Sequence, residues 1–437
     1  MAYVDHHIVK STFPRSGLIL VFTSLCLMLC LSCQDNTSNN NEESIAPKKE
    51  LAANDILGNP EYQAISYGGY RNKTRDTQPT IAELKEDMNI LAAMNIKIIR
   101  TYQTKLPQAG NVLKAIRELK NEDPAFEMYV MLGVWIDCKD ARTEKPDHNS
   151  EDVEANAAEI QRAVDMATEY PDIVKVIAVG NEAMVKWASE YFVQPDVILK
   201  WVNHLQSLKQ QGNLPASLWI TSSDNFASWG GGGAEYHKAD LTELMKAVDY
   251  ISIHTYPMHD THYNSAFWGV EEGEITLSDR AKINAAMLRA RDYAISQHQN
   301  TVAYIKSLGI DKPVHIGETG WASVSDGLYS PDGSRACDEY KQGIYYTLMR
   351  DWAKETGISC FFFEAFDEPW KGGDSPGDSE KHFGLFDVNG KAKYAIWDEV
   401  DQGLFKGLSR GGSSIERTYN GNKDSLLNEV LVPPLKK

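Results

Sequence analysis

Two stretches of the chain share one design: residues 176–182 read VIAVGNE and residues 315–323 read HIGETGWAS. Each is a short apolar run that includes a glycine and reaches a glutamate, Glu182 in the first and Glu318 in the second. Short apolar runs rich in branched residues are typical of parallel β-strands that are buried on both faces. The two stretches therefore predict buried strands that each present a carboxylate at the carboxyl end.

Similar apolar runs recur along the body of the chain and alternate with stretches of helical length. The strand-like runs cover residues 62–67, 97–101, 128–134, 173–179, 217–221, 250–254, 313–317 and 360–363. The helix-like stretches cover residues 81–94, 111–119, 154–170, 197–210, 241–247, 281–308 and 338–356. Strands that alternate with helices predict a parallel sheet with right-handed crossovers. Eight such repeats favour a closed (β/α)₈ barrel, the TIM barrel, in a single α/β domain.

The composition agrees with one such domain and restricts its partners. The chain has 437 residues, a formal net charge of −17 and 42% hydrophobic residues, which fits one large barrel with short tails. The acidic balance argues against nucleic acid as a partner and is compatible with a neutral polysaccharide. The first strand is not followed by Gly-x-Gly-x-x-Gly, which argues against a dinucleotide-binding fold.

The N-terminal region has the features of an export signal. Basic Lys10 and Arg15 precede an apolar run over residues 17–31, which is shorter than the ~20 residues of a membrane span and ends Leu-Ser-Cys at Cys33. This resembles a bacterial lipoprotein cleavage box, and we expect Cys33 to become the lipidated N-terminus. An ordinary signal peptide or an uncleaved anchor is the alternative. We therefore expect an exported, membrane-anchored lipoprotein at the cell surface or in the periplasm, with the outer membrane favoured.

The remaining boundaries follow from composition. Residues 1–33 are the predicted signal peptide, and residues 34–54 are polar and Asn/Ser-rich, as in a flexible tether. The barrel domain is expected over residues 55–405. Residues 406–437 are polar and Ser/Gly-rich, which predicts a weakly ordered tail.

Polar or aromatic residues follow every predicted strand. In a barrel these positions form a ring around one mouth, so Glu182 and Glu318 are expected to meet there. Two carboxylates that face each other across a sugar bond are the minimum equipment for glycoside hydrolysis. Flat aromatic side chains with a polar edge suit the faces and hydroxyls of a sugar, and those that follow strands include Tyr102, Trp135, Trp321 and Trp370.

Three motifs carry a family resemblance. VIAVGNEA, IGETGWAS and FFFEAFDEPWK resemble the signatures of glycoside hydrolase family 17, the β-1,3-glucanases, and the resemblance extends from about residue 62 to residue 400. It implies a retaining (β/α)₈ enzyme with Glu182 as general acid/base and Glu318 as nucleophile. It also implies that Glu368 and Lys371 form a charged pair beside the nucleophile.

The residues suggest how the two carboxyls could be given different roles. Lys371 and the hydroxyl of Tyr256 would lower the pKa of Glu318, whereas Glu182 needs a less polar setting or the nearby charge of Glu318 to stay protonated. Asn181 could bind the sugar 2-hydroxyl. His254 and Tyr256 follow the sixth strand, where the resemblance places residues that contact the substrate and the nucleophile.

Three histidines and two cysteines raise the possibility of a metal site or a disulfide. His254, His259 and His262 lie in a proline-containing loop, with no cysteine or acidic cluster to complete a metal site, so we expect neither metal nor cofactor. Cys138 and Cys337 follow strands on the mouth side and could be bridged in an exported protein, or could be free. Cys360 lies within a predicted strand and is expected in the core.

These observations lead to one main hypothesis and several alternatives. We predict a retaining glycoside hydrolase that cleaves β-1,3-glucosidic bonds in laminarin-type glucan by double displacement and acts as a monomer, with no nucleic-acid partner. A β-1,3-glucan transglycosylase that uses the same two glutamates is the nearest alternative. A β-glucanase or mannanase of a related family is a lesser one. A surface glycan-binding lipoprotein without catalysis is a fourth, although a pure binder has no need of both glutamates.

Overall fold

The computed structural model describes residues 51–436. The predicted signal peptide, Cys33 and the tether as far as residue 50 lie outside the described residues. The domain begins slightly earlier than expected, because α1 (Ala53–Ile56) is a short helix with both terminal residues buried. The backbone N–H of Ala53 donates to the carbonyl of Ser217, 3.0 Å away, which attaches this helix to the body of the domain.

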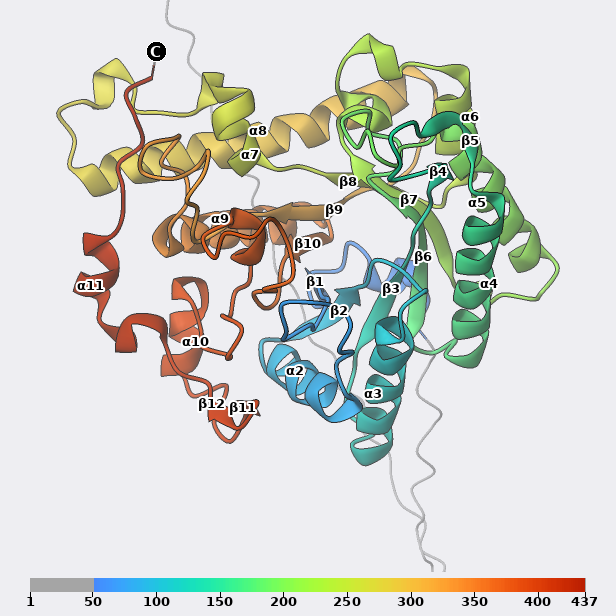
Figure 1. Cartoon of the computed structure of the whole chain (residues 1–437), viewed down its shortest axis with the longest axis horizontal. Coiled ribbons are helices and arrows are strands. Elements are labelled where there is room, and N and C mark those ends of the chain that lie inside the picture. Colours follow the sequence, from blue (N-terminus) through green and yellow to red (C-terminus); the bar gives the residue numbers. More distant parts are fainter. Residues whose placement is uncertain (1–50, 437) are drawn as a thin grey trace, which may run out of the picture. The chain divides into compact units, whose positions relative to one another are not determined.

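Eight parallel strands close into a barrel (Figure 1). Around the barrel their order is β1, β2, β3, β6, β7, β8, β9 and β10, and β10 pairs with β1. The strands are β1 (Gln63–Ser66), β2 (Ile96–Arg100), β3 (Tyr129–Val134), β6 (Val174–Asn181), β7 (Trp219–Asn225), β8 (Ile251–His254), β9 (Val314–Gly320) and β10 (Cys360–Phe363). The prediction of a (β/α)₈ barrel is confirmed. The strands β6, β7 and β9 run two to four residues further toward the mouth than the sequence indicated.

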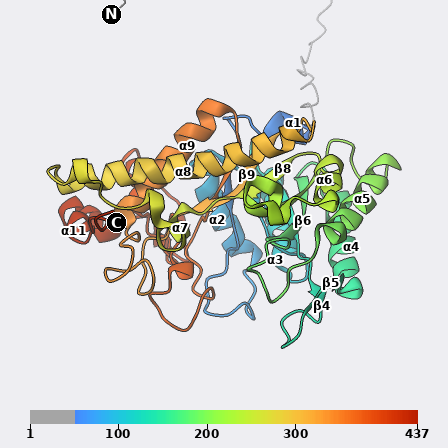
Figure 2. The same ribbon diagram turned by 90° about the horizontal axis from the view of Figure 1, so that it is seen from above.

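Helices lie outside the ring of strands. The helices after α1 are α2 (Ile81–Ala93), α3 (Gln108–Glu122), α4 (Val153–Glu169), α5 (Pro195–Gln210), α6 (Ala239–Ala247), α7 (Pro257–Tyr263), α8 (Asp279–Ser307), α9 (Glu339–Thr356), α10 (Trp397–Asp401) and α11 (Lys423–Asn428). Polar caps define several starts: Thr80 and Glu83 form a capping box on α2, and Asp338 accepts from Lys341 N–H at the start of α9. Figure 2 shows the long α8 running past β8 and β9.

The barrel interior changes character along the strands. An apolar cluster that includes Ile98, Met131, Val176, Tyr250 and Phe361 fills the lower part. Side chains on a strand alternate between its two faces, so residues two or four positions further along point into the same interior. These positions include Arg100 after Ile98 and His254 after Tyr250, and both are buried. The inward-facing side chains are therefore apolar in the lower part of the barrel and polar near its mouth.

A small hairpin stands beside the mouth. The strand β4 (Cys138–Lys139) pairs antiparallel with β5 (Asp147–Glu151), outside the barrel sheet. It is built from the segment between β3 and α4. The backbone N–H of Cys138 donates to the carbonyl of Tyr191, 3.1 Å away, which ties the hairpin to the loop that follows β6.

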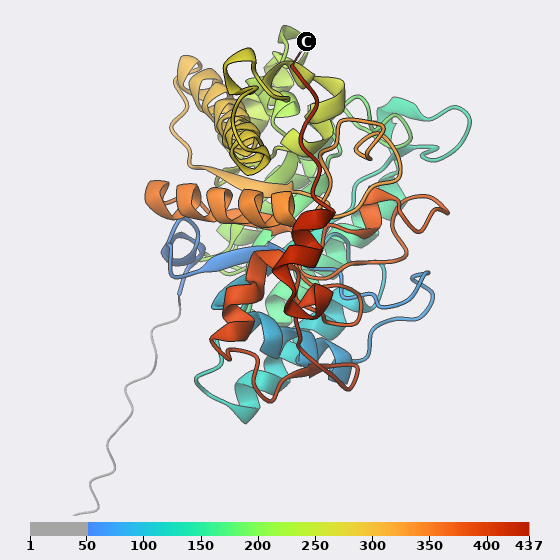
Figure 3. The ribbon, with the colours of Figure 1, turned by 90° about the vertical axis from the view of Figure 1, so that its left-hand side faces the viewer.

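The expectation of a weakly ordered tail is wrong for residues 406–436. This segment forms β11 (Ser409–Arg410), β12 (Ser413–Ser414) and α11, and Figure 3 shows it, in red, crossing the side of the barrel over α9. The buried guanidinium of Arg410 pairs with Asp87 of α2 at 2.8 Å, and residue 435 bridges to Val270. Composition predicted disorder because few apolar residues are present. The segment is instead held by a buried ion pair and by backbone pairing, which composition does not report.

None of the helices within residues 51–436 is long and apolar enough to cross a membrane.

Candidate active site

A cavity of about 1000 Å³ opens at the carboxyl ends of the strands. The loops after β1, β2, β3, β6 and β10 and the first turns of α4 contribute its walls. The predicted residues that line it are Tyr102, Trp135, Asn181, Glu318, Glu368, Trp370 and Lys371. Glu182, His254 and Tyr256 do not line it, but His254 contacts both Glu182 and Glu318, and Tyr256 contacts Glu318, so the sequence motifs converge on one mouth as a barrel requires.

Glu318 lies at the floor of this cavity, with its side chain 7% exposed. The guanidinium of Arg100 pairs with its Oε1, and the hydroxyl of Tyr256 donates to its Oε2 over 2.7 Å. Burial alone would raise the pKa of Glu318. The nearby His254 and Arg100, together with the Tyr256 hydrogen bond, outweigh burial and lower this pKa below its ordinary value. Glu318 is therefore held as a carboxylate, and the predicted contact with Tyr256 is present.

The cation beside Glu318 is Arg100, not Lys371 as the sequence suggested. Arg100 ends β2 and is 1% exposed, and it also donates to the carbonyl of Gly317 over 3.2 Å and to Oδ1 of Asn181 over 2.5 Å. One guanidinium thus links three strands at the mouth. Its position on the same face as Ile98, inside a buried strand, was the sequence signal that could have identified it.

Lys371 belongs to a separate charged cluster in the loop after β10. Its Nζ lies 2.6 Å from Oε2 of Glu364 and 3.0 Å from Oε2 of Glu368. Burial raises the pKa of Glu364 well above its ordinary value, although Lys371 opposes this shift. Glu368 also accepts the backbone N–H of Tyr70 over 3.0 Å, which joins the loop after β10 to the loop after β1. The pair of Glu368 and Lys371 is present at the cavity wall, but Lys371 neutralises these carboxyls rather than Glu318.

Glu182 has a different backbone setting from Glu318. It follows β6 directly and has a φ of +48°, a left-handed conformation that is uncommon for a residue with a side chain. Its backbone N–H donates to the carbonyl of Ser223 over 3.0 Å, and its carboxyl, 16% exposed, lies 3.1 Å from Nδ1 of His254. The positive φ turns the chain so that the side chain faces the neighbouring strands.

His254 connects the two carboxyls. Its Nδ1 lies 3.1 Å from Oε1 of Glu182 and 3.7 Å from Oε2 of Glu318, while its Nε2 lies 2.8 Å from the hydroxyl of Ser223. The residue was expected to contact substrate, but its side chain is 0% exposed. We correct that assignment: His254 contacts Glu182 and Glu318 from below and positions them.

Three of the predicted aromatic residues, Tyr102, Trp135 and Trp370, line the cavity. Trp135 packs on Tyr191 with ring centres 5.0 Å apart, and the guanidinium of Arg75 lies 4.2 Å from the ring centre of Trp370. The hydroxyl of Tyr102 is buried and has no hydrogen-bond partner within residues 51–436. Burial raises the pKa of Tyr102 well above its ordinary value, so the hydroxyl keeps its proton and can act as a donor.

Trp321 does not form a wall of the cavity. Its side chain is fully buried, its Nε1 donates to the carbonyl of Ala336 over 2.8 Å, and its ring packs on Tyr345 of α9. Thr319, two residues earlier, also contacts Tyr345. Alternation along the strand explains the difference, because residues 319 and 321 face the helices whereas Glu318 faces the barrel mouth.

The family to which the chain belongs follows from comparison with known proteins. The family described as "BtgE/BtgC glycoside hydrolase domain" matches residues 64–384, which is more than half of the chain. The chain belongs to this family. Its match runs from β1 to the loop after β10 and includes both Glu182 and Glu318.

The chain is also similar to solved structures and curated proteins whose names describe enzymes that act on β-1,3-glucan. The crystal structure of an endo-laminarinase from Formosa Hel1_33_131 is 64% identical, with a TM-score of 0.88, over 89% of this chain and 98% of that one. A glucan endo-1,3-β-glucosidase from Emericella nidulans is 25% identical over 73% of this chain. A β-1,3-glucanosyltransferase mutant from Rhizomucor miehei, in complex with laminaritriose, shares the fold at 21% identity and a TM-score of 0.53, over 77% of this chain and 96% of its own. The chain spans 38–42% of the length of the first curated relatives it matches.

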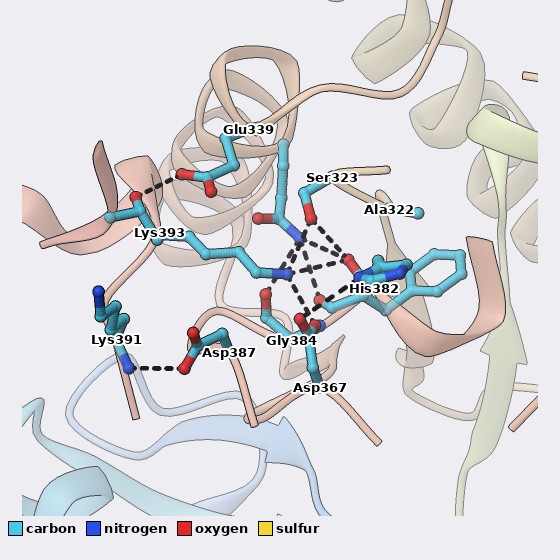
Figure 4. A network of polar contacts seen from close by, with 12 residues as sticks. Ala322, Ser323, Glu339, Asp367, His382, Gly384, Asp387, Lys391 and Lys393 are labelled. Atoms are coloured by element: carbon cyan, nitrogen blue, oxygen red, sulfur yellow. Dashed lines mark hydrogen bonds and ion pairs between the residues drawn. The ribbon is translucent and has the colours of Figure 1, made fainter. Parts of the chain in front are cut away.

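A buried polar network fixes the loop that carries the cluster of Glu364, Glu368 and Lys371 (Figure 4). The ammonium of Lys393 donates to Oδ1 of Asp367 over 2.7 Å and to the hydroxyl of Ser323 over 2.8 Å. The same oxygen of Asp367 accepts the backbone N–H of Gly384 over 2.9 Å. Asp367, the first acidic residue of the sequence FDEPWK, thus faces this network rather than the cavity. The network ties the loops after β9 and β10 together.

The remaining histidines and cysteines have structural surroundings. His259 stacks on Tyr256 with ring centres 5.1 Å apart. Within residues 51–436 no group of three or more His, Cys, Asp or Glu side chains is arranged so that it could hold a metal ion. Cys138, Cys337 and Cys360 are buried and free, so the possible bridge between the first two is not formed.

Proposed function

We propose that this protein hydrolyses β-1,3-glucosidic bonds in laminarin-type glucan, with retention of the anomeric configuration. The observation that carries the proposal is a pair of carboxyls that contact the same imidazole, that of His254: Glu318 lines an aromatic-walled cavity, and Glu182 lies beside it. The endo-laminarinase that matches this chain over nearly its own full length supports the choice of substrate.

Glu318 is the nucleophile in this proposal. Its carboxylate attacks the anomeric carbon, and the bond to the leaving oxygen breaks as the bond to Glu318 forms. Arg100 and the hydroxyl of Tyr256 keep the attacking group ionised before the reaction. Burial and the charge of Glu318 raise the pKa of Tyr256 well above its ordinary value, so it stays a hydrogen-bond donor throughout.

Glu182 is the general acid and then the general base. In the first step it gives its proton to the leaving sugar oxygen. In the second step it takes a proton from water, whose oxygen attacks the anomeric carbon and releases Glu318. Because the first step and the second each invert the anomeric carbon, the product keeps the β configuration.

The geometry favours retention over inversion. Retaining pairs have carboxyls about 5–5.5 Å apart, whereas inverting pairs are about 6.5–9.5 Å apart so that a water fits between them. One oxygen of Glu182 and one of Glu318 lie 3.1 and 3.7 Å from the same nitrogen of His254. The distance between these two oxygens cannot exceed the sum of their distances to that nitrogen. Most of the separations typical of inverting pairs are therefore too long for these two oxygens.

Several groups on the cavity wall can bind the sugar. Arg100 holds Oδ1 of Asn181, which leaves the amide nitrogen to donate to the sugar 2-hydroxyl. The unpartnered hydroxyl of Tyr102 offers a second donor. The rings of Trp135 and Trp370 offer flat surfaces for glucosyl faces.

Product analysis tests both the substrate and the mechanism. Incubation with laminarin should release short oligosaccharides, and proton NMR taken before mutarotation should show the β-anomer first. An initial α-anomer would exclude double displacement and turn Glu318 into a general base. Products longer than the substrate would indicate transglycosylation. If laminarin is unchanged, the alternative of a non-catalytic glycan-binding protein would be favoured.

Within the wider group of β-1,3-glucanases we place the chain in glycoside hydrolase family 17. The motif FFFEAFDEPWK supports this, and so does the ion pair of Glu368 with Lys371 at the cavity wall. We propose that the protein acts as a monomer, which light scattering of the purified domain should report as the mass of one chain.

We also propose a lipid anchor at Cys33, based on the basic, apolar and Leu-Ser-Cys pattern of residues 1–33. Each buried CH₂ of an acyl chain contributes about 0.8 kcal/mol, so a multiply acylated cysteine anchors stably. The variant Cys33→Ala should move the protein from the membrane fraction to the soluble fraction. Unchanged fractionation would assign the anchor to the apolar segment itself.

A further inference from the structure

The strand β7 supports the backbone around Glu182 at two points. Asn181 and Ser223 are partners in the register between β6 and β7. The N–H of Glu182 donates to the carbonyl of Ser223 over 3.0 Å, and the N–H of Met184 donates to Oδ2 of Asp224 over 2.7 Å. One anchor thus lies at Glu182 itself and the second lies two residues later. Both come from consecutive residues of the same neighbouring strand.

Asp224 is buried and makes no contact with the cavity. Its side chain is fully buried, Oδ1 accepts from the hydroxyl of Ser228 over 2.6 Å and from the N–H of Asn225 over 2.8 Å, and Oδ2 accepts from Met184. Burial raises the pKa of this carboxyl to about 6, and the hydrogen bonds from Ser228 and Met184 oppose that shift. Burying a carboxylate costs folding free energy, which hydrogen bonds to both of its oxygens partly offset. A carboxylate kept at such a site needs a structural reason.

The conformation of Glu182 supplies that reason. A residue with a side chain adopts a φ of +48° only where its surroundings hold it there. Releasing the N–H of Met184 would let residues 182–184 relax, and the carboxyl of Glu182 would move away from His254. A shift of about 1 Å at a catalytic group can cost roughly 100-fold in rate.

We propose that Asp224 is a positioning residue for the general acid/base, holding the segment Glu182–Met184 through the N–H of Met184. This inference rests on the proposed function, because it assigns Asp224 to the role given to Glu182. Asp224 touches neither the substrate cavity nor Glu318. It is expected to affect only the steps in which Glu182 moves a proton.

The variant Asp224→Asn tests this role. An amide has one acceptor oxygen, so an NH₂ group must face either the N–H of Met184 or the donors Ser228 and Asn225. We expect kcat on laminarin to fall about 10- to 100-fold, with KM nearly unchanged. We expect a much smaller loss in the first step on a dinitrophenyl β-laminarioside, because its leaving group departs without a proton. Azide should restore turnover of that substrate, since azide attacks the glycosyl-enzyme without a general base.

Asp249→Asn is the matched control. Asp249 also accepts a backbone N–H of β7, that of Ile220 over 2.7 Å, but at the opposite end of the strand from the cavity, where it also binds Lys209 over 2.8 Å. We expect this variant to lower the melting temperature and to leave the ratio of the two substrates' rates as in the wild type. Circular dichroism melts of both variants separate loss of fold from loss of positioning.

The results that would overturn the inference differ from those that would overturn the function. The inference can be judged if wild type cleaves both substrates and Glu182→Ala slows laminarin more than the dinitrophenyl substrate. If Asp224→Asn then loses the same factor in rate on both substrates, and azide does not restore turnover, Asp224 does not have this role. If wild type cleaves neither substrate, the proposed function itself fails. Should Asp224→Asn not fold, Ser228→Ala keeps the Met184 contact but loosens the carboxylate. If Ser228→Ala slows laminarin about threefold more than the dinitrophenyl substrate, the inference is supported. If the ratio of the two rates equals that of the wild type, the inference is overturned.

Discussion

The surroundings of Glu318 and those of Glu182 differ although both residues are glutamates at the same barrel mouth. Glu318 is 7% exposed and contacts a guanidinium and a phenolic hydroxyl. Glu182 is 16% exposed, and its carboxyl contacts the imidazole of His254. A carboxylate that must attack an anomeric carbon needs partners that favour its charge, whereas a group that gives and takes a proton must be able to hold it. The difference shows that environment, not residue type, separates the two proposed roles.

Their backbones differ as well. Glu318 lies within strand β9, where it pairs with His254 of β8 directly after an irregularity in the register between the two strands. Glu182 lies just beyond β6 in a left-handed conformation. The proposed nucleophile is therefore positioned inside a strand of the sheet. The proposed acid/base lies beyond its strand and is positioned by individual contacts to β7, so single substitutions should disturb it more easily.

Removing the charge of Glu318 should have the largest effect on activity. In Glu318→Gln the side chain keeps its size but can no longer attack, so hydrolysis of laminarin should fall by more than about 10,000-fold. Reducing-sugar release measures the loss, and circular dichroism checks that the fold survives. Substantial residual hydrolysis that added azide does not change would remove Glu318 from the nucleophile's role.

Removing the carboxyl of Glu182 should give a smaller and substrate-dependent loss. In Glu182→Ala the rate on laminarin should fall about 100- to 10,000-fold, because the leaving sugar oxygen needs a proton. An aryl β-laminarioside with a good leaving group should lose far less in its first step. Parallel assays on the two substrates test this, and equal losses would contradict the comparison between the carboxyls.

Removing the hydroxyl of Tyr256 should weaken only the surroundings of Glu318. The lost hydrogen bond to a charged group corresponds to about a 10- to 100-fold fall in kcat/KM for Tyr256→Phe, on both substrates alike. Tyr67→Phe is a suitable control, because its hydroxyl donates to buried Asp87 over 2.9 Å outside the cavity. The control should lose stability and keep its activity per folded molecule. If Tyr256→Phe behaves as the control does, Tyr256 serves the fold only.

The smallest expected effect concerns stability against pH. The pKa of Glu318 is lower in the folded state than the ordinary glutamate value of 4.5. Its ionised form therefore adds stability above about pH 4.5, and this contribution is lost as the pH falls through the lowered folded-state pKa. Urea unfolding of wild type and Glu318→Gln should show a free-energy difference that narrows between pH 6 and pH 3. A difference that widens in acid would mean that this pKa is raised.

The order of strands and helices could be predicted from the sequence because it depends on local patterns. Apolar runs such as VIAVG and FFF predict buried strands wherever they occur, and the caps of α2 and α9 are local hydrogen bonds. The two glutamates could be predicted for the same reason. Each follows a buried strand directly, and a parallel barrel brings such positions to one mouth.

The errors arise where the answer depends on which face a residue takes or on which distant residue it meets. Trp321 follows its strand as closely as the cavity residues do, yet the alternation of β9 turns it toward α9. Arg100, rather than Lys371, reaches Glu318. The sequence indicates that Arg100 points into the barrel, but it does not indicate which carboxyl on which distant strand Arg100 meets. The polar tail is ordered because Arg410 finds Asp87 on α2.

The sequence by itself thus determined the barrel, its eight strands and the two carboxyls at its mouth, since periodicity and strand ends are properties of neighbouring residues. Only the tertiary structure decided how those carboxyls differ. The residues that set the charge and direction of Glu318 and Glu182 are Arg100, Tyr256, His254 and Ser223, which come from other strands and from the loop after β8. Electrostatic and hydrogen-bond effects act through space over a few ångströms, and folding decides which residues come that close.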